Sequence, residues 1–335
     1  MNRFHVSLLT GTMMLALAAC TQANMSEAPP IDAQQATVTA ANSAADRKVL
    51  KVGDPGFHPV DLNGPRRPDP FPEEDLSKKP EWKDKTPNYR AKKPKKDKDL
   101  ATDTPDVVPG QWQWGTQLLN TGNNQETCYY AAHQIQTGLN LPQPPANSTI
   151  GYNIVYAPTM MPADGGPLEA VTIYSMKAGT SVMVRQFGAW NHSITSGSNW
   201  VYTTNLNANF QNYYTTWDNN RQMYTVQIWR SQGNMAVYLW NYVSGTWDQK
   251  GPWQAGSRPA SLGTEGWNMF ETYLNGTCPF LPTIEADYIQ VNPGKQGWRL
   301  ATGSNYAVNR NYDAGTCNNY VYTWLGSFYH WRVSP

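Results

Sequence analysis

The sequence predicts an all-β fold, a two-sheet jelly-roll-like β-sandwich preceded by a long N-terminal segment. From residue 106 onward, short runs of alternating apolar and polar residues are separated by turn residues, and helical periodicity is nearly absent. The same 230 residues hold 13 Trp, 18 Tyr and 5 Phe, enough to bury a sizeable core. So aromatic a sheet needs protected edges, which favours a sandwich over an open sheet. A propeller or trefoil would require three or more clear repeats, which the sequence does not contain.

The first twenty residues form a predicted export signal. A basic start is followed by the apolar run Val6–Ala19, which is too short to span a bilayer, and by Leu17-Ala18-Ala19-Cys20. This ending resembles the lipobox of bacterial lipoproteins. The resemblance implies cleavage before Cys20, lipid on its sulfur, and, because Thr follows in place of Asp, an outer-membrane or surface location. The alternative is an ordinary signal peptide with a chance Cys, and it implies export as well.

Residues 20–105 are predicted to be a disordered tether. Positions 21–105 hold 12 Pro and only four aromatic residues, so they bury too little surface to offset the entropy of ordering. Within this segment, Lys78–Lys98 has ten basic residues against three acidic ones. Such a run either attracts anionic envelope polymers and lipid head groups or serves as a solvated spacer.

The strands of the predicted sandwich, residues 106–335, are organised around one hairpin. Gln222–Arg230 and Met235–Val243 flank the turn residues Ser231 to Asn234. Glu126–Thr137 is the one segment predicted to be a short helix. The other predicted strands are Gln111–Leu119, Gly151–Ala157, Ala170–Met176, Ser181–Phe187, Trp200–Thr204, Met269–Tyr273, Thr283–Val291 and Tyr320–Val333.

Both faces of the central hairpin carry large apolar side chains. Because side chains alternate along a strand, Tyr224, Val226 and Ile228 are predicted to share the core face with Val237 and Leu239. The rings on the opposite face exceed what a core requires. Rings stack on the apolar faces of sugars, so the predicted ligand-binding residues are Trp229, Tyr238, Trp240, Tyr242, Trp247 and Trp253, with Asp218 and Arg221. The alternative is that these rings form cross-strand pairs which stabilise the sheet.

A short repeat suggests a disulfide. Y-x-x-G-T-C occurs at Tyr273–Cys278 and again at Tyr312–Cys317, and the exported compartment permits oxidation. We therefore expect a disulfide between Cys278 and Cys317. Cys128 is expected to be a buried structural thiol on the short helix.

Two carboxylates are spaced to share one face of a strand. Glu285 and Asp287 lie two residues apart, which places both side chains on the same side. The run Glu285–Gln290 resembles E-x-D-x-x-E, the catalytic strand of family 16 glycoside hydrolases, in which the first Glu is the nucleophile and the last the acid/base. Position 290 is Gln here, so a two-carboxylate mechanism would lack its acid. A calcium site or a polar sheet edge would explain the pair equally well.

Several chemistries have no support in the sequence. There is no H-x-H, HExxH or C-x-x-C pattern and no Gly-rich phosphate loop, so no metal or cofactor is expected. The sandwich region carries 10 basic and 11 acidic residues, and this neutrality together with export argues against nucleic-acid binding.

The segment Gly266-Trp-Asn-Met-Phe-Glu271, followed by Ile284–Gln290, is similar to exported β-sandwich proteins of environmental bacteria, a likeness that implies fold and not function. The sequence therefore predicts a surface lipoprotein that binds glycan without turnover. One alternative is a polysaccharide hydrolase or lyase using Glu271, Glu285 or Asp287. Another is an envelope scaffold or adhesion protein that binds a protein partner.

Overall fold

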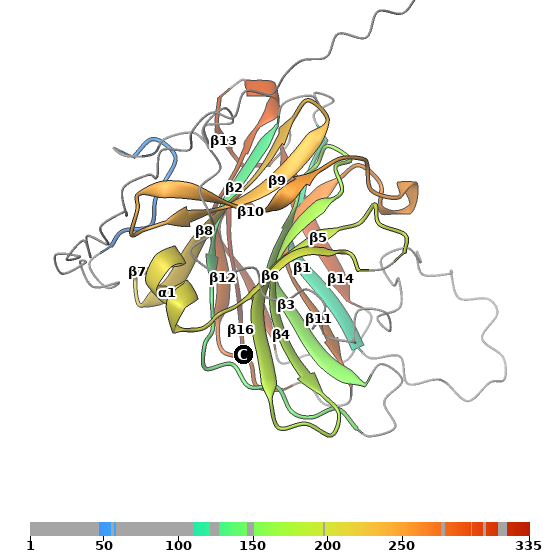
Figure 1. Cartoon of the computed structure of the whole chain (residues 1–335). Coiled ribbons are helices and arrows are strands. Elements are labelled where there is room, and N and C mark those ends of the chain that lie inside the picture. Colours follow the sequence, from blue (N-terminus) through green and yellow to red (C-terminus); the bar gives the residue numbers. More distant parts are fainter. Residues whose placement is uncertain are drawn as a thin grey trace, which may run out of the picture. The chain divides into compact units, whose positions relative to one another are not determined.

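The computed structural model describes residues 47–54, 57, 110–120, 127–145, 151–196, 198–275, 279–295, 297–303, 306–313 and 320–335. Within these ranges the chain forms two antiparallel sheets that pack as a β-sandwich, and it contains one short α-helix (Figure 1). This confirms the predicted fold class. No helix in the described ranges combines the length and apolar character needed to cross a membrane.

The first sheet has seven strands in the order β14-β1-β11-β3-β4-β5-β6. Strand β11 lies between β1 and β3, so segments far apart in sequence meet in the middle of this sheet. The strands are β1 (Gly110–Leu118), β3 (Tyr152–Met161), β4 (Leu168–Lys177), β5 (Met183–Asn191), β6 (Trp200–Asn205), β11 (Gly266–Leu274) and β14 (Ala307–Asp313).

The second sheet has nine strands, seven of them in the order β10-β9-β8-β2-β12-β16-β15. Two short strands join at the sides: β7 pairs with β8, and β13 pairs with β12. The strands are β2 (Cys128–Gln134), β7 (Thr215–Asp218), β8 (Arg221–Ser231), β9 (Asn234–Asn241), β10 (Thr246–Gln254), β12 (Ile284–Asn292), β13 (Arg299–Leu300), β15 (Val321–Gly326) and β16 (His330–Ser334).

The core lies between the inner faces of the two sheets. Tyr224, Val226 and Ile228 of β8 belong to one buried cluster together with Val237 and Leu239 of β9, as the alternation predicted. The same cluster includes inner-face residues of the seven-stranded sheet, among them Val155, Ala170, Tyr174, Phe187 and Phe270. The inner-face side chains of the two sheets thus pack against one another, and the side chains of the outer faces can contact other parts of the chain or a ligand.

The predicted central hairpin is confirmed. Strands β8 and β9 pair antiparallel from Ser231 opposite Asn234 to Val226 opposite Leu239. The two turn residues, Gln232 and Gly233, both have positive φ, 49° and 80°, as a type I′ hairpin turn requires.

The short helix predicted at Glu126–Thr137 is wrong, because Cys128–Gln134 is strand β2. This strand is hydrogen-bonded on both sides, to β8 and β12, and all seven of its residues are buried. A central strand buried on both faces does not alternate in polarity, so its pattern resembles that of a helix. Cys128 is buried and free, as expected, but lies on a strand.

Other elements were not predicted. Strands β10 and β14 carry Gln, Lys, Asn and Asp among their apolar residues, which weakens the alternation. The predicted strand Tyr320–Val333 is two strands, β15 and β16. The chain also forms helix α1 (Ala208–Tyr214), whose N-cap Asn207 accepts a hydrogen bond from the backbone N–H of Phe210.

Part of the predicted tether packs on the sandwich. Val49 and Leu50 are buried against the outer face of the nine-stranded sheet, and Phe57 contacts rings on the same face. The lipobox with Cys20, the basic run 78–98 and the cysteines 278 and 317 of the expected disulfide lie outside the described residues.

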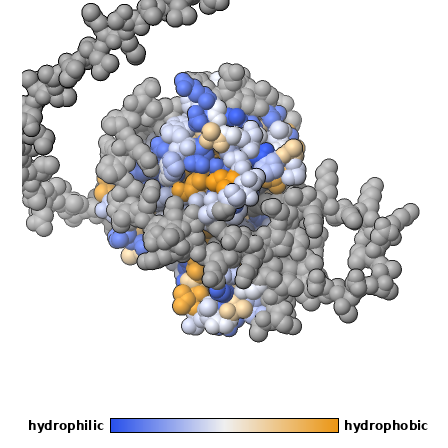
Figure 2. Space-filling model, turned by 45° about the vertical axis from the view of Figure 1, so that its right-hand side comes forward, coloured by the Kyte–Doolittle hydropathy of each residue, from blue (hydrophilic) through white to orange (hydrophobic). Residues whose placement is uncertain are grey.

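The face of the molecule in Figure 2 shows small apolar patches among polar and weakly polar residues.

Candidate functional site

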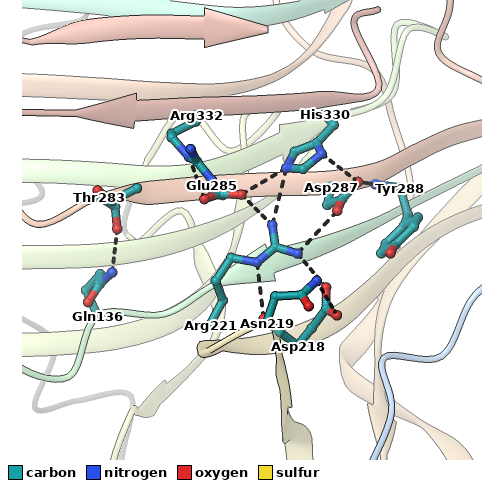
Figure 3. A network of polar contacts seen from close by, with 10 residues as sticks. All are labelled: Gln136, Asp218, Asn219, Arg221, Thr283, Glu285, Asp287, Tyr288, His330 and Arg332. Atoms are coloured by element: carbon teal, nitrogen blue, oxygen red, sulfur yellow. Dashed lines mark hydrogen bonds and ion pairs between the residues drawn. The ribbon is translucent and has the colours of Figure 1, made fainter. Parts of the chain in front are cut away.

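A cluster of charged side chains covers part of the outer face of the nine-stranded sheet, and Figure 3 shows it at close range. Glu285 and Asp287 of β12 leave the same side of their strand, as predicted. Glu285 accepts hydrogen bonds from Arg332 Nε at 2.7 Å and from Arg221, and its Oε2 lies 2.9 Å from His330 Nε2. Arg221 Nη2 lies 3.5 Å from Asp287. We call these five residues the charged cluster.

The charged cluster shifts its two carboxylates in opposite directions. Burial by itself would raise the pKa of Glu285, but the hydrogen bond to His330 and the charges of Arg221 and Arg332 lower that pKa to about 2. Burial raises the pKa of Asp287, and His330 opposes this only in part. Glu285 is thus held ionised by three cationic or protonatable side chains, so it is suited to anchoring strands and is a poor proton donor.

Two of the residues predicted to bind a ligand lie here: Arg221 is a member of the charged cluster, and Asp218 lies beside it. Asp218, at the end of β7, forms an ion pair with Arg221, which begins β8. Arg221 therefore connects β7, β8 and β12, and through His330 it reaches β16 as well. Gln290, the departure from E-x-D-x-x-E, is buried on the same strand beyond a bulge.

The outer face of the seven-stranded sheet holds a second constellation, around Glu271. Gln113 of β1 and Glu271 of β11 lie directly opposite one another across the ladder. Gln113 Nε2 donates to Glu271 Oε1 at 2.7 Å, and the hydroxyl of Tyr273 donates to the same oxygen at 2.5 Å. Glu271 has no exposed surface, and Gln113 and Tyr273 are 4% and 6% exposed. We call these three residues the Glu271 group.

Aromatic side chains border the Glu271 group. The ring of Tyr156 lies 5.9 Å from that of Tyr273 in an edge-to-face arrangement. Tyr156 and Tyr273 belong to a cluster on the same outer face that also includes Ile154, Ile173 and Trp200. The Glu271 carboxylate is thus buried beside apolar side chains and accepts hydrogen bonds from two neutral donors, Gln113 and Tyr273.

A second carboxylate on this face, Glu169 of β4, has its own partners. Its Oε1 accepts from Trp267 Nε1 at 2.9 Å, and its Oε2 lies 2.9 Å from His192 Nε2. Trp267 and Glu271 are four residues apart on β11, a separation of about 13 Å along a strand. Glu169 therefore belongs to a different part of the face.

The rings predicted to bind a ligand lie on the outer face of the nine-stranded sheet, and most of them are buried. Trp229, Tyr238 and Trp240 are 5–6% exposed, and Tyr242 and Trp247 are half-buried. The rings of Trp240 and Trp247 make an edge-to-face contact at 5.3 Å between centroids. We call the rings of the outer face of the nine-stranded sheet, including Tyr130 of β2, the aromatic face. At its margin, Trp253 is 36% exposed.

Sequence reasoning missed several residues of these sites. Gln113, His330 and Arg332 lie in no motif, and only the pairing of distant strands brings them to Glu271 and Glu285. Tyr273 lies two residues from Glu271 on the same strand, and its motif suggested a disulfide instead. Within the described ranges, no three His, Cys, Asp or Glu side chains converge in a way that could hold a metal ion.

Comparison with known proteins shows no family. No family model and no curated protein matches the chain. One similar solved structure is SCP-B, a member of the eqolisin family of peptidases in a complex with the tripeptide Ala-Ile-His. It is 11% identical with a TM-score of 0.32, over 67% of this chain and 98% of that one. Another is the CBM2 module of an evolved Dit from Lactobacillus casei BL23 phage J-1. It is 9% identical with a TM-score of 0.24, over 49% of this chain and 63% of that one. At these TM-scores neither likeness assigns a function.

Proposed function

We propose that the protein hydrolyses acyl bonds, amides or esters, with Glu271 and Gln113 as its reacting groups. The observation that carries the proposal is the direct hydrogen bond between the Gln113 amide and the Glu271 carboxylate on an aromatic-lined sheet face. Hydrolysis of an acyl bond needs a base for the attacking water and a donor for the oxyanion. These two side chains supply one of each.

The role of each side chain follows from whether it can accept or donate a proton or a hydrogen bond. Glu271 takes a proton from a water molecule as the water oxygen attacks the carbonyl carbon. Gln113 donates one N–H to Glu271 in the structure, and the proposal requires its amide to turn a donor towards the developing oxyanion during the reaction. Glu271 then returns the proton to the leaving nitrogen or oxygen as the acyl bond breaks. Tyr273 holds the carboxylate in place throughout.

Glycoside hydrolysis fits the geometry less well. It requires two carboxyl groups roughly 5–9.5 Å apart, one of them able to donate a proton. Glu169 contacts Trp267, which lies four residues along β11 from Glu271, so these two carboxylates have separate surroundings. In the charged cluster, Glu285 has a pKa of about 2 and is a poor acid, so the proton donor would have to be Asp287, whose pKa burial raises.

Hydrolysis at this site requires that a substrate can reach Glu271. Glu271 is fully buried in the structure, so a substrate reaches it only after part of the chain moves aside. We therefore expect the intact protein to be slow, and limited proteolysis to increase its activity.

The test is turnover of a peptide and ester panel by the full chain, before and after limited proteolysis. Glu271→Gln should lower turnover at least about 100-fold, and Gln113→Ala by a similar factor, because each removes a group that acts in the transition state. Glu169→Gln is the matched control, since Glu169 is equally buried on the same face. Turnover that survives Glu271→Gln would falsify the assignment, and so would its absence on every substrate.

Glycan binding without turnover is a second candidate, favoured by the exposed ring of Trp253. Its centroid lies 6.4 Å from that of Tyr238, at the open margin of the aromatic face. If glycans bind there, Trp253→Ala should abolish retention on insoluble polysaccharides. Trp217→Ala, which removes another exposed Trp, should not. Release of reducing ends in the same assay would mark an enzyme and not a lectin.

Surface anchoring through Cys20 is part of the proposal and is supported by the lipobox sequence. Cys20→Ala should move the protein from the membrane fraction to the soluble exported fraction. An unchanged distribution would contradict lipid attachment.

A further inference from the structure

The aromatic face is contacted by a segment from the chain's own N-terminal region. This segment, residues 47–54 together with Phe57, we call the strap. Val49 is buried against Ala132 and Met223, and Leu50 is 8% exposed. Phe57 makes edge-to-face contacts with three rings, those of Tyr130, Trp247 and Trp298, at centroid distances of 6.0–6.4 Å.

Fixed hydroxyl groups of the sheet bind the strap's backbone. Tyr130 donates from its hydroxyl to the carbonyl oxygen of Leu50, and Thr216 donates to the carbonyl oxygen of Arg47. The backbone N–H of Leu50 donates to the Tyr242 hydroxyl at 3.5 Å. These hydrogen bonds recognise main-chain atoms, so any extended peptide that places them alike could make them.

The strap also has polar contacts at both ends. Arg47 Nη1 donates to the carbonyl oxygen of Asn212, a residue of helix α1, at 2.5 Å. Lys51 Nζ lies 4.3 Å from the centre of the Tyr288 ring, a cation–π contact. Tyr288 has a positive φ of 53° at the bulge of β12, a strained conformation that presents its ring to the strap.

The strap is bound to the sandwich without being part of its sheets. Residues 47–54 form no strand, and every strand pairing found in the described ranges joins residues from Gly110 onward. The sheets therefore do not need the strap to complete their ladders. The contacts that hold it come from aromatic and apolar side chains, from hydroxyl groups and from the Asn212 carbonyl, and a separate peptide could make the same contacts.

We propose that the aromatic face is a peptide-binding surface, and that the strap is its ligand, bound in cis. The expected ligand is an extended chain with two adjacent aliphatic residues, as Val49 and Leu50 are in the strap. An aromatic residue, corresponding to Phe57, follows seven positions after the second of them. This inference goes beyond the proposed hydrolysis. It concerns the other sheet and does not depend on Glu271.

The test cuts the covalent link between ligand and surface. A site for a specific protease is inserted between Arg90 and Ala91 of the full chain, and the cleaved protein is analysed by size exclusion and mass spectrometry. We expect the N-terminal fragment to remain with the sandwich. We expect Leu50→Asp combined with Phe57→Ala to release it. Lys48→Asp is the matched control, because Lys48 lies in the same segment but is exposed, and it should retain the fragment.

A second measurement identifies the ligand class. A synthetic peptide of residues 45–58, added in excess, should displace the fragment from the cleaved protein, because it carries the same Leu50 and Phe57, and size exclusion with mass spectrometry should detect the released fragment. Soluble polysaccharide should not displace the fragment. Loss of the fragment from the unaltered cleaved protein overturns the proposal, as does its retention by the Leu50/Phe57 variant. Displacement by polysaccharide would make the face a glycan site instead.

Discussion

Neutralising Glu285 should destabilise the sandwich, whereas neutralising Asp287, two residues along the same strand, should not. Glu285 is bonded by His330 and Arg332 of β16 and by Arg221 of β8, and it is 2% exposed. Its partners overcome the effect of burial and lower its pKa from 4.5 to about 2. For Asp287, burial prevails and raises the pKa. The two carboxylates therefore contribute to stability with opposite signs.

The magnitude follows from the linkage between pKa and folding. Lowering a pKa from 4.5 to about 2 corresponds to about 3 kcal/mol of unfolding free energy, at roughly 1.4 kcal/mol per unit. Because the folded-state pKa of Glu285 is below the unfolded one, this stabilisation is complete above about pH 4.5 and is lost as the pH falls towards 2. For Asp287 the raised pKa means that its ionised form opposes folding near neutral pH, so Asp287→Asn should leave stability unchanged or increase it.

The assay is urea unfolding followed by Trp fluorescence, from about pH 7 down to about pH 3. Glu285→Gln should lower the unfolding free energy by about 1–3 kcal/mol near neutral pH, because solvent screens the ion pair with the partly exposed Arg332. The difference from the wild type should shrink below about pH 5, since only the wild type loses this contribution. A difference under about 1 kcal/mol, or one independent of pH, would refute the reasoning. So would Asp287→Asn if it destabilised as much as Glu285→Gln.

Three further predictions concern buried positions. Gly115→Ala should lower the free energy of unfolding, measured by thermal denaturation, by about 2–4 kcal/mol. Gly115 has φ +148°, and a Cβ there would lie 2.5 Å from the Asn268 carbonyl oxygen. Gly138→Ala is the control and should have little effect, because a Cβ at Gly138 meets no atom within 4 Å. Burial lowers the pKa of His133 to about 3, so stability due to neutral His133 should fall as the pH drops below about 6.5, and His133→Gln should flatten that slope. Burial raises the pKa of the Cys128 thiol, so it should react with a thiol reagent only after unfolding in urea.

Alternation of side chains was sufficient to predict the strands with one buried and one outer face. The β8–β9 hairpin is the clearest case, because its turn residues and its core face both matched. Strand β2 was missed because Tyr129, Tyr130, Ala131 and Ala132 place apolar or small side chains on both of its faces, whereas β8 keeps Thr225 and Gln227 between its core residues. Helix α1 is only seven residues long, too short to show a helical period.

The candidate sites were predictable only in part. The spacing of Glu285 and Asp287 was enough to place both on one face, because that relation is local. The contact between Gln113 and Glu271 joins residues 158 positions apart, on strands that become neighbours only through the sheet order. Gln113 lies in no motif, so no pattern in the sequence could have linked it to Glu271.

The surplus of rings on the central hairpin suggested an external ligand, and the structure shows that surface in contact with the chain itself. Tyr130 and Trp247 are covered by Phe57, and Leu50 is bound by two Tyr hydroxyls. A surplus of aromatic residues on a sheet face therefore indicates that another segment or molecule packs on that face. It does not indicate whether that packing is permanent or reversible. Because the strap makes no ladder hydrogen bonds with either sheet, the ladders of the two sheets are complete without it. The role of the aromatic face can thus be tested by displacing the strap from it. The charged cluster joins β8, β12 and β16 through hydrogen bonds to Glu285, so its role can be tested only by measuring the free energy of unfolding.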